Sequence, residues 1–208
     1  MKKYSYIGVA FIILIFGIYA IPKIINTLSK HELAIIGKAP AFEFINQNGE
    51  LLSDSYYKNK VYVVEFFFTT CPTICPIMNE NMVKIQNEFY GNTSFGIASF
   101  SINPSYDTPE TLKEYAKKNG ATLKTWHFFT GEQDDIYTLA NKGFALYAGE
   151  NPEAAGGFEH SGMFALIDKS GHIRSRFDEF GNPIAFYDGL DAGYIQMLKE
   201  DIAILLKE

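Results

Sequence analysis

The most informative part of this 208-residue chain reads Val61-Tyr-Val-Val-Glu-Phe-Phe-Phe68-Thr-Thr-Cys71-Pro-Thr-Ile-Cys75-Pro-Ile-Met78 and contains both of its cysteines. The run from Val61 to Phe68 is β-branched and aromatic with a single charge, which is typical of a strand buried on both faces. After Cys75, Gly91 provides a stop, and the apolar side chains at helical spacing are Ile77, Met78, Met82, Ile85 and Phe89. The sequence therefore predicts a buried strand, a turn that carries both thiols, and a helix.

The segments that follow repeat this alternation of strand and helix. A second buried strand is predicted over 95–102, and a helix opens at Asp107-Thr-Pro-Glu110 and ends near Gly120. A short strand at 126–130, a helix after 131–135 and a closing helix from Asp191 complete the pattern. The side chains expected to point inward from the closing helix are Tyr194, Ile195, Leu198, Ile202 and Leu205. Strand, helix, strand, helix indicates right-handed βαβ units.

Two β-hairpins are predicted outside these units. The first pairs 41–45 with 50–53 around an Asn/Gly turn, and the second pairs 163–167 with 172–177. Between them, the glycine-rich segment 149–157 is expected to be a loop. This order predicts an α/β, thioredoxin-like fold with an N-terminal β-hairpin, in which the cysteines follow the first central strand. Open α/β sheets bind ligands at the carboxyl ends of such strands.

The N-terminus has the composition of a membrane segment. Lys2 and Lys3 precede an uncharged, mostly apolar run over 4–21, close to the roughly 17 to 25 residues that cross the hydrocarbon core as a helix. We expect residues 1–3 to be a cytoplasmic region, 4–22 a transmembrane anchor or alternatively a signal peptide, 23–37 a tether, and 38–208 the thioredoxin-like domain. The protein would then be single-pass in the cell membrane, with its domain on the extracytoplasmic (periplasmic) side, where disulfides can form.

Composition and charge limit the class of protein. The chain is 47% hydrophobic and 20% charged, so it can fill one globular core, and 208 residues are too few for two large domains. Its net charge is −6, and its lysines and arginines are scattered along the sequence. We therefore expect one folded domain that does not bind nucleic acid.

The two thiols have the spacing of a chemical site. Cys71 and Cys75 are four residues apart, which places them on one helical face about one turn from each other. Pro72 and Pro76 restrict the turn, and helix N-terminal amides lower the pKa of a cysteine. The pair can act as a metal site, as a redox-active dithiol, or as both in turn. A permanent disulfide is the alternative, but it would close too short a loop to remove much unfolded-state entropy.

Two thiolates under-coordinate most metals, so a third ligand is expected. His160 is the leading candidate because it precedes the 163–167 strand in a loop that faces the cysteine turn in thioredoxin-like folds. His31, His127 and His172 are interpreted as surface or structurally satisfied residues. Two soft thiolates and one imidazole suit Cu(I), and can also hold Cu(II) if another donor joins, whereas a structural zinc site would more often demand a fourth protein ligand.

Several motifs in this chain resemble the Sco/SenC family, the membrane-anchored copper chaperones of cytochrome c oxidase assembly. The matching segments are 66–78, 99–104, 107–110, 112–115, 159–161, 164–168 and 187–189. This resemblance implies that Cys71, Cys75 and His160 are copper ligands, and that the partner is the copper-site subunit of cytochrome c oxidase or another copper-handling protein. Many members carry an acidic residue where Thr73 stands, and a histidine where Thr70 stands.

Two functions from different classes follow from these residues. The first is a copper-binding assembly factor that delivers copper to, or prepares, the binuclear copper site of a respiratory oxidase. The second is a thiol-disulfide oxidoreductase that acts on partner cysteines through Cys71 and Cys75. A peroxidase is a weaker third alternative, because only the fold would support it. Metal transfer and thiol exchange are compatible, since Cu(I) requires both cysteines to be reduced.

Overall fold

The computed structural model describes residues 5–28 and 32–208, which divide into two compact units at residues 32 and 33. The smaller unit contains helix α1 (Ser5–Leu28). Within the described residues, no helix is both long enough and apolar enough to cross a membrane, so the predicted anchor over 4–22 is not confirmed. The predicted cytoplasmic region, residues 1–3, and His31 lie outside the described residues.

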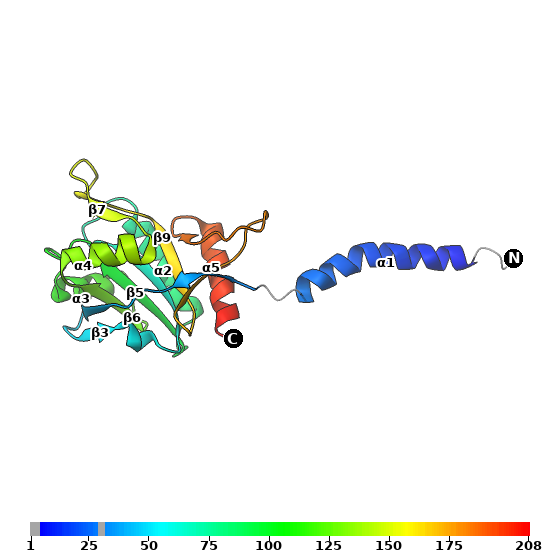
Figure 1. Cartoon of the computed structure of the whole chain (residues 1–208), viewed down its shortest axis with the longest axis horizontal. Coiled ribbons are helices and arrows are strands. Elements are labelled where there is room, and N and C mark those ends of the chain that lie inside the picture. Colours follow the sequence, from blue (N-terminus) through cyan, green and yellow to red (C-terminus); the bar gives the residue numbers. More distant parts are fainter. Residues whose placement is uncertain (1–4, 29–31) are drawn as a thin grey trace. The chain divides into compact units, whose positions relative to one another are not determined.

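The larger unit is built on one mixed sheet. Within residues 33–208 this sheet has nine strands, in the order β1-β10-β9-β4-β5-β6-β2-β3, with β11 paired to β9 (Figure 1). The strands are β1 (Ala34–Lys38), β2 (Glu43–Asn46), β3 (Leu51–Ser53), β4 (Val61–Phe67), β5 (Phe95–Ser101), β6 (Trp126–Thr130), β9 (Met163–Ile167), β10 (His172–Ser175) and β11 (Tyr187–Asp188). The central strands β4, β5 and β6 are parallel, and the flanking strands are antiparallel to their neighbours. The βαβ prediction is therefore confirmed.

Helices cover both faces of this sheet. They are α2 (Cys75–Glu88), α3 (Pro109–Lys118), α4 (Gln133–Thr138), a π-helix η2 (Leu139–Phe144) and α5 (Ala192–Leu205), with a short 3-10 turn η1 (Asp54–Tyr57) after β3. Adjacent residues of a strand point to opposite faces. Phe66 of β4 meets Phe144 of η2, with ring centroids 6.1 Å apart, and Phe67 meets Tyr115 of α3 at 5.3 Å. Every residue of β4 is buried as a result, as the sequence predicted.

Both predicted hairpins are present. In the first, β2 and β3 pair through a turn in which Gly49 has a φ of +77°, a conformation that favours glycine. The side-chain oxygen of Asn46 accepts hydrogen bonds from the backbone N–H groups of Asn48 and Glu50 and so closes this turn. In the second, β9 pairs with β10. The structure thus confirms the thioredoxin-like order of elements with its N-terminal hairpin.

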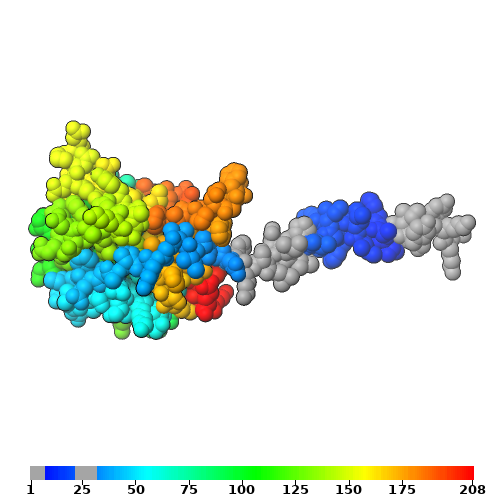
Figure 2. Space-filling model, in the orientation of Figure 1, coloured from blue at the N-terminus to red at the C-terminus, as the bar shows by residue number. Residues whose placement is uncertain are grey.

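Two boundaries in the prediction differ from the structure. The expected tether over 23–37 is not a linker throughout, because α1 continues to Leu28 and β1 begins at Ala34 and pairs with β10. The expected loop over 149–157 begins two residues later, because Gly149 and Glu150 belong to β7 (Ala148–Glu150), which pairs with β8 (Phe158–His160) in a second, two-stranded sheet. Residues 151–157 form the loop between these two strands. In Figure 2 the yellow tip of this hairpin stands out from the surface.

Candidate metal centre

The two cysteines lie where β4 passes into α2. A β-turn follows β4, in which the Cys71 N–H donates to the Phe68 carbonyl at 3.2 Å. Helix α2 begins at Cys75, with Pro76 in its first turn. The first amides of a helix have no partner within the helix, and the Cys75 N–H points to the Cys71 sulfur at 3.5 Å. The helix start therefore stabilises negative charge on Cys71.

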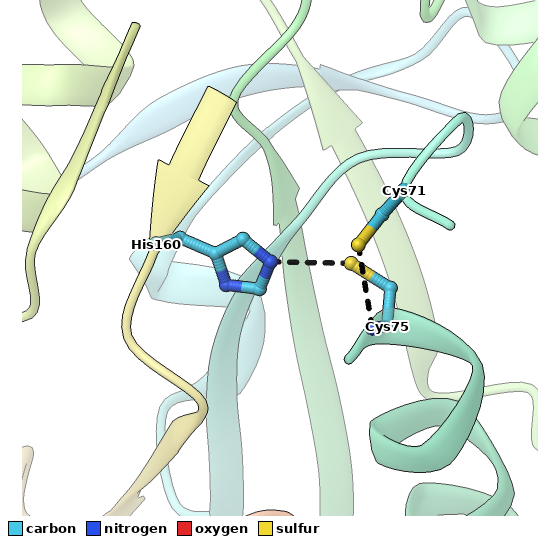
Figure 3. A group of neighbouring side chains, drawn as sticks. All are labelled: Cys71, Cys75 and His160. Carbon is cyan, nitrogen blue, oxygen red and sulfur yellow. Dashed lines mark hydrogen bonds between the residues drawn. The ribbon is translucent and has the colours of Figure 1, made fainter. Parts of the chain in front are cut away.

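His160 completes the cluster from the other side. It is the last residue of β8, and its Nε2 lies 3.2 Å from the Cys75 sulfur (Figure 3). Its Nδ1 lies 3.0 Å from the Ser161 carbonyl oxygen, which can only accept a hydrogen bond. This contact fixes the tautomer that leaves Nε2 free to bind a metal. The ligand atoms of Cys71, Cys75 and His160 all lie within 4.8 Å of one another.

The pKa values of the two thiols are shifted in opposite directions. The pKa of Cys71 is lowered to about 3, chiefly by the hydrogen bond from the Cys75 thiol and further by contacts to His160 and to the backbone N–H groups of Cys75 and Thr73. The pKa of Cys75 is raised well above its usual range, first by that same hydrogen bond and then by burial. These opposite shifts favour the thiolate on Cys71 and the protonated thiol on Cys75.

A small cavity gives access to this cluster. Its volume is about 200 Å³, and its lining includes Cys71 and His160 but not Cys75. Phe68, Ile74 and Phe158 supply apolar walls. The cavity is large enough for an ion with one or two small ligands and too small for a typical organic substrate. Cys71 and His160 are thus the two residues of the cluster that line the cavity.

Glu65 is a feature of the site that sequence reasoning did not single out. It is the one charged residue of β4 and is 3% exposed. Its Oε1 accepts a hydrogen bond from the Ser99 hydroxyl at 2.6 Å, and Ser99 in turn accepts one from the Trp126 indole at 2.9 Å. Burial raises the pKa of Glu65 to about 7, although Ser99 and His160 oppose the shift. The signal in the sequence was a lone carboxylate in an otherwise apolar strand.

The remaining described histidines do not join the cluster. His127 is buried in β6, with its Nδ1 3.4 Å from the Asn46 amide nitrogen and its ring edge-on to Tyr56. Burial lowers the pKa of His127. His172 is partly exposed and lies 3.6 Å from Asp168. Both agree with their interpretation as structural or surface residues.

The donor set determines which metals the site fits. Within residues 5–28 and 32–208, one group of three or more histidine, cysteine, aspartate or glutamate side chains could hold a metal ion. It consists of Cys71, Cys75 and His160. Two sulfurs and one imidazole nitrogen are soft donors that suit Cu(I), whereas structural zinc usually takes four protein ligands. The fold and this cluster define a thioredoxin-like protein with a buried group of two cysteines and one histidine that could hold a metal ion.

A sequence model of the SCO1/SenC family matches residues 34–192. The chain belongs to this family. The SCO1 protein homolog of Bacillus subtilis (strain 168) is 32% identical to it over 143 residues, which are 68% of this chain and 74% of that protein.

Two solved structures share the fold at 28% sequence identity. The SCO1/SenC family lipoprotein from Bacillus anthracis str. Ames has a TM-score of 0.71, with 81% of this chain and 95% of that chain covered. BsSco, described as a member of the Sco family of cytochrome c oxidase assembly proteins with a disulfide switch, has a TM-score of 0.69, with 84% and 96% covered. The family expected from the sequence motifs is confirmed.

Proposed function

We propose that this protein is a copper-binding assembly factor that delivers copper to, or prepares, the binuclear copper site of a respiratory cytochrome c oxidase. The observation that carries this proposal is the convergence of the Cys71, Cys75 and His160 ligand atoms within 4.8 Å. Membership of the SCO1/SenC family and similarity to BsSco support it. The partner is then the copper-site subunit of the oxidase or another copper-handling protein.

The three residues contribute to copper binding in different ways. Cys71 and His160 line the cavity, so entering copper can reach both residues. The pKa shifts favour a thiolate on Cys71 and a protonated thiol on Cys75. Since copper binds thiolates, full ligation requires Cys75 to release that proton. The Ser161 carbonyl keeps the His160 ring in the tautomer that can ligate.

Copper titration of the reduced protein tests this function. We expect one copper per chain, with two sulfur and one nitrogen neighbours in the X-ray absorption spectrum, because the described residues offer those three donors together. The measurement can be made on residues 33–208, which form a compact unit. A copper-binding stoichiometry far below one, or a first shell without sulfur, would contradict the proposal.

A second candidate function, thiol-disulfide exchange on a partner, is favoured by the charge on Cys71. A thiolate is the attacking species in such exchange, and Cys71 is the member of the pair that lines the cavity. Cys75, which does not line the cavity, would resolve the mixed disulfide. Reduction of an oxidised partner by the copper-free protein distinguishes this function from copper delivery.

We further propose that the N-terminal segment attaches the domain to the cell membrane and that the domain lies on the extracytoplasmic side. The apolar run over 4–21 and similarity to a family lipoprotein support this location. We expect the full chain to sediment with membranes and a variant lacking residues 1–32 to remain in the supernatant. Protease added to spheroplasts should digest the domain of the full chain. Recovery of the full chain in the soluble fraction would exclude the attachment.

A further inference from the structure

Asp107 is a buried carboxylate close to the cysteine turn to which neither proposed function gives a role. It lies just before α3 and is 0% exposed. Within residues 33–208 it forms no ion pair with a lysine, arginine or histidine, so hydrogen bonds are the contacts that compensate for the burial of its carboxyl group. A buried polar group is costly unless its hydrogen-bond partners are held in place.

Two of its three hydrogen bonds come from one residue, Thr69. The Thr69 N–H donates to Oδ2 of Asp107 at 3.0 Å, and the Thr69 hydroxyl donates to Oδ1. The third donor is the hydroxyl of Ser101, the last residue of β5. Asp107 therefore links the end of β5 to the chain segment that leaves β4.

Thr69 lies within the turn that leads from β4 to Cys71. The β-turn from Phe68 to Cys71 has Thr69 and Thr70 as its two central residues, and the Cys71 N–H closes it. Asp107 accepts hydrogen bonds from both the backbone and the side chain of Thr69, so it fixes the orientation of the turn and with it the position of Cys71. The neighbouring Thr70 is exposed, and its hydroxyl has no hydrogen-bond partner within residues 33–208.

We propose that Asp107 is a positioning residue of the metal site, which acts through Thr69 to hold the Cys71 sulfur beside Cys75 and His160. This inference rests on the proposed function for its role in copper binding. Its effect on the thiol pair is independent of copper. Holding one thiol near the other raises their effective concentration for both chelation and disulfide formation.

The test compares three variants at the turn. Thr69→Val keeps the shape and the N–H but removes the hydroxyl, Thr69→Ser restores the hydroxyl, and Thr70→Val makes the same change at the neighbouring central position. We expect Thr69→Val to weaken Cu(I) binding about tenfold, as loss of an outer-shell contact typically does. Thr69→Ser and Thr70→Val should remain within about twofold of wild type, because Thr69→Ser keeps a hydroxyl that can donate to Asp107 and Thr70→Val removes a hydroxyl that has no partner within residues 33–208.

A copper-free measurement separates the positioning role from the copper function. The equilibrium of the Cys71–Cys75 disulfide with glutathione should become about tenfold less favourable in Thr69→Val, which is a rise of about 30 mV in the midpoint potential. If wild type binds no copper but this shift occurs, the copper function is wrong and the positioning role holds. Wild-type values for Thr69→Val in both measurements, or an equal loss in Thr70→Val, would overturn the inference. A Thr69→Val protein that fails to fold would be replaced by Asp107→Asn, judged by the same two measurements.

Discussion

Oxidation of Cys71 and Cys75 to a disulfide is expected to abolish tight copper binding. Both sulfurs are free thiols in the structure, and they supply two of the three donors of the site. The disulfide would leave His160 as a single ligand. Loss of simultaneous binding by linked donors costs up to about 10⁴-fold in affinity, and we expect a reduction of that order.

The measurement is a competition titration against a Cu(I) chelator, with the reduced and the oxidised protein under the same anaerobic conditions. Re-reduction of the oxidised sample should restore the original affinity, which controls for damage during oxidation. A double Cys71→Ser and Cys75→Ser variant should bind copper no better than the oxidised protein. Equal affinity of the oxidised and reduced forms would show that the sulfurs are not the ligands.

Replacement of His160 with alanine is expected to weaken copper binding by at least about 100-fold. Loss of a residue that only supports a metal ligand costs up to about 100-fold, and this substitution removes a ligand itself. His160 Nε2 already lies 3.2 Å from the Cys75 sulfur and needs no large movement to join a shared ion. The absorption spectrum of the Cu(II) form should change as well, since one nitrogen donor is replaced. Affinity and spectrum are measured by titration of the reduced protein.

His172→Ala is the matched control for this substitution. His172 is partly exposed, lies near Asp168 and is not part of the metal cluster. Its replacement should leave both the affinity and the spectrum at wild-type values. If His160→Ala retained the full Cu(II) affinity and spectrum, the proposed ligation by His160 would be wrong.

Much of the fold could be predicted from local patterns. The buried run of β4, the Asn46–Gly49 turn and the proline-started helices each depend on residues within a few positions of one another. The prediction was wrong where pairing partners lie far apart in the chain. β1 is a strand because β10, more than a hundred residues later, supplies its hydrogen bonds.

The hairpin that carries His160 shows the same limit. Its glycines predict a loop, and the tip does contain Gly156 and Gly157 with φ values of +90° and +82°. Their neighbours nevertheless pair as β7 and β8. A side chain at Gly156 would meet Phe68 at 2.8 Å, so the absence of one allows the hairpin to pack against the cysteine turn. Sequence patterns do not reveal such a close approach.

The sequence by itself determined that two thiols stand at the start of a helix after a buried strand, because helix, strand and turn preferences are local. It also identified His160 as the best third ligand through its place before β9 and through family motifs. Only the tertiary structure decided that His160 contacts the sulfur of Cys75, which is 85 residues away in the sequence. It also decided that Asp107 accepts a hydrogen bond from Thr69 in the turn before Cys71. These contacts arise from the packing of distant segments, which fixes distances that spacing along the chain does not.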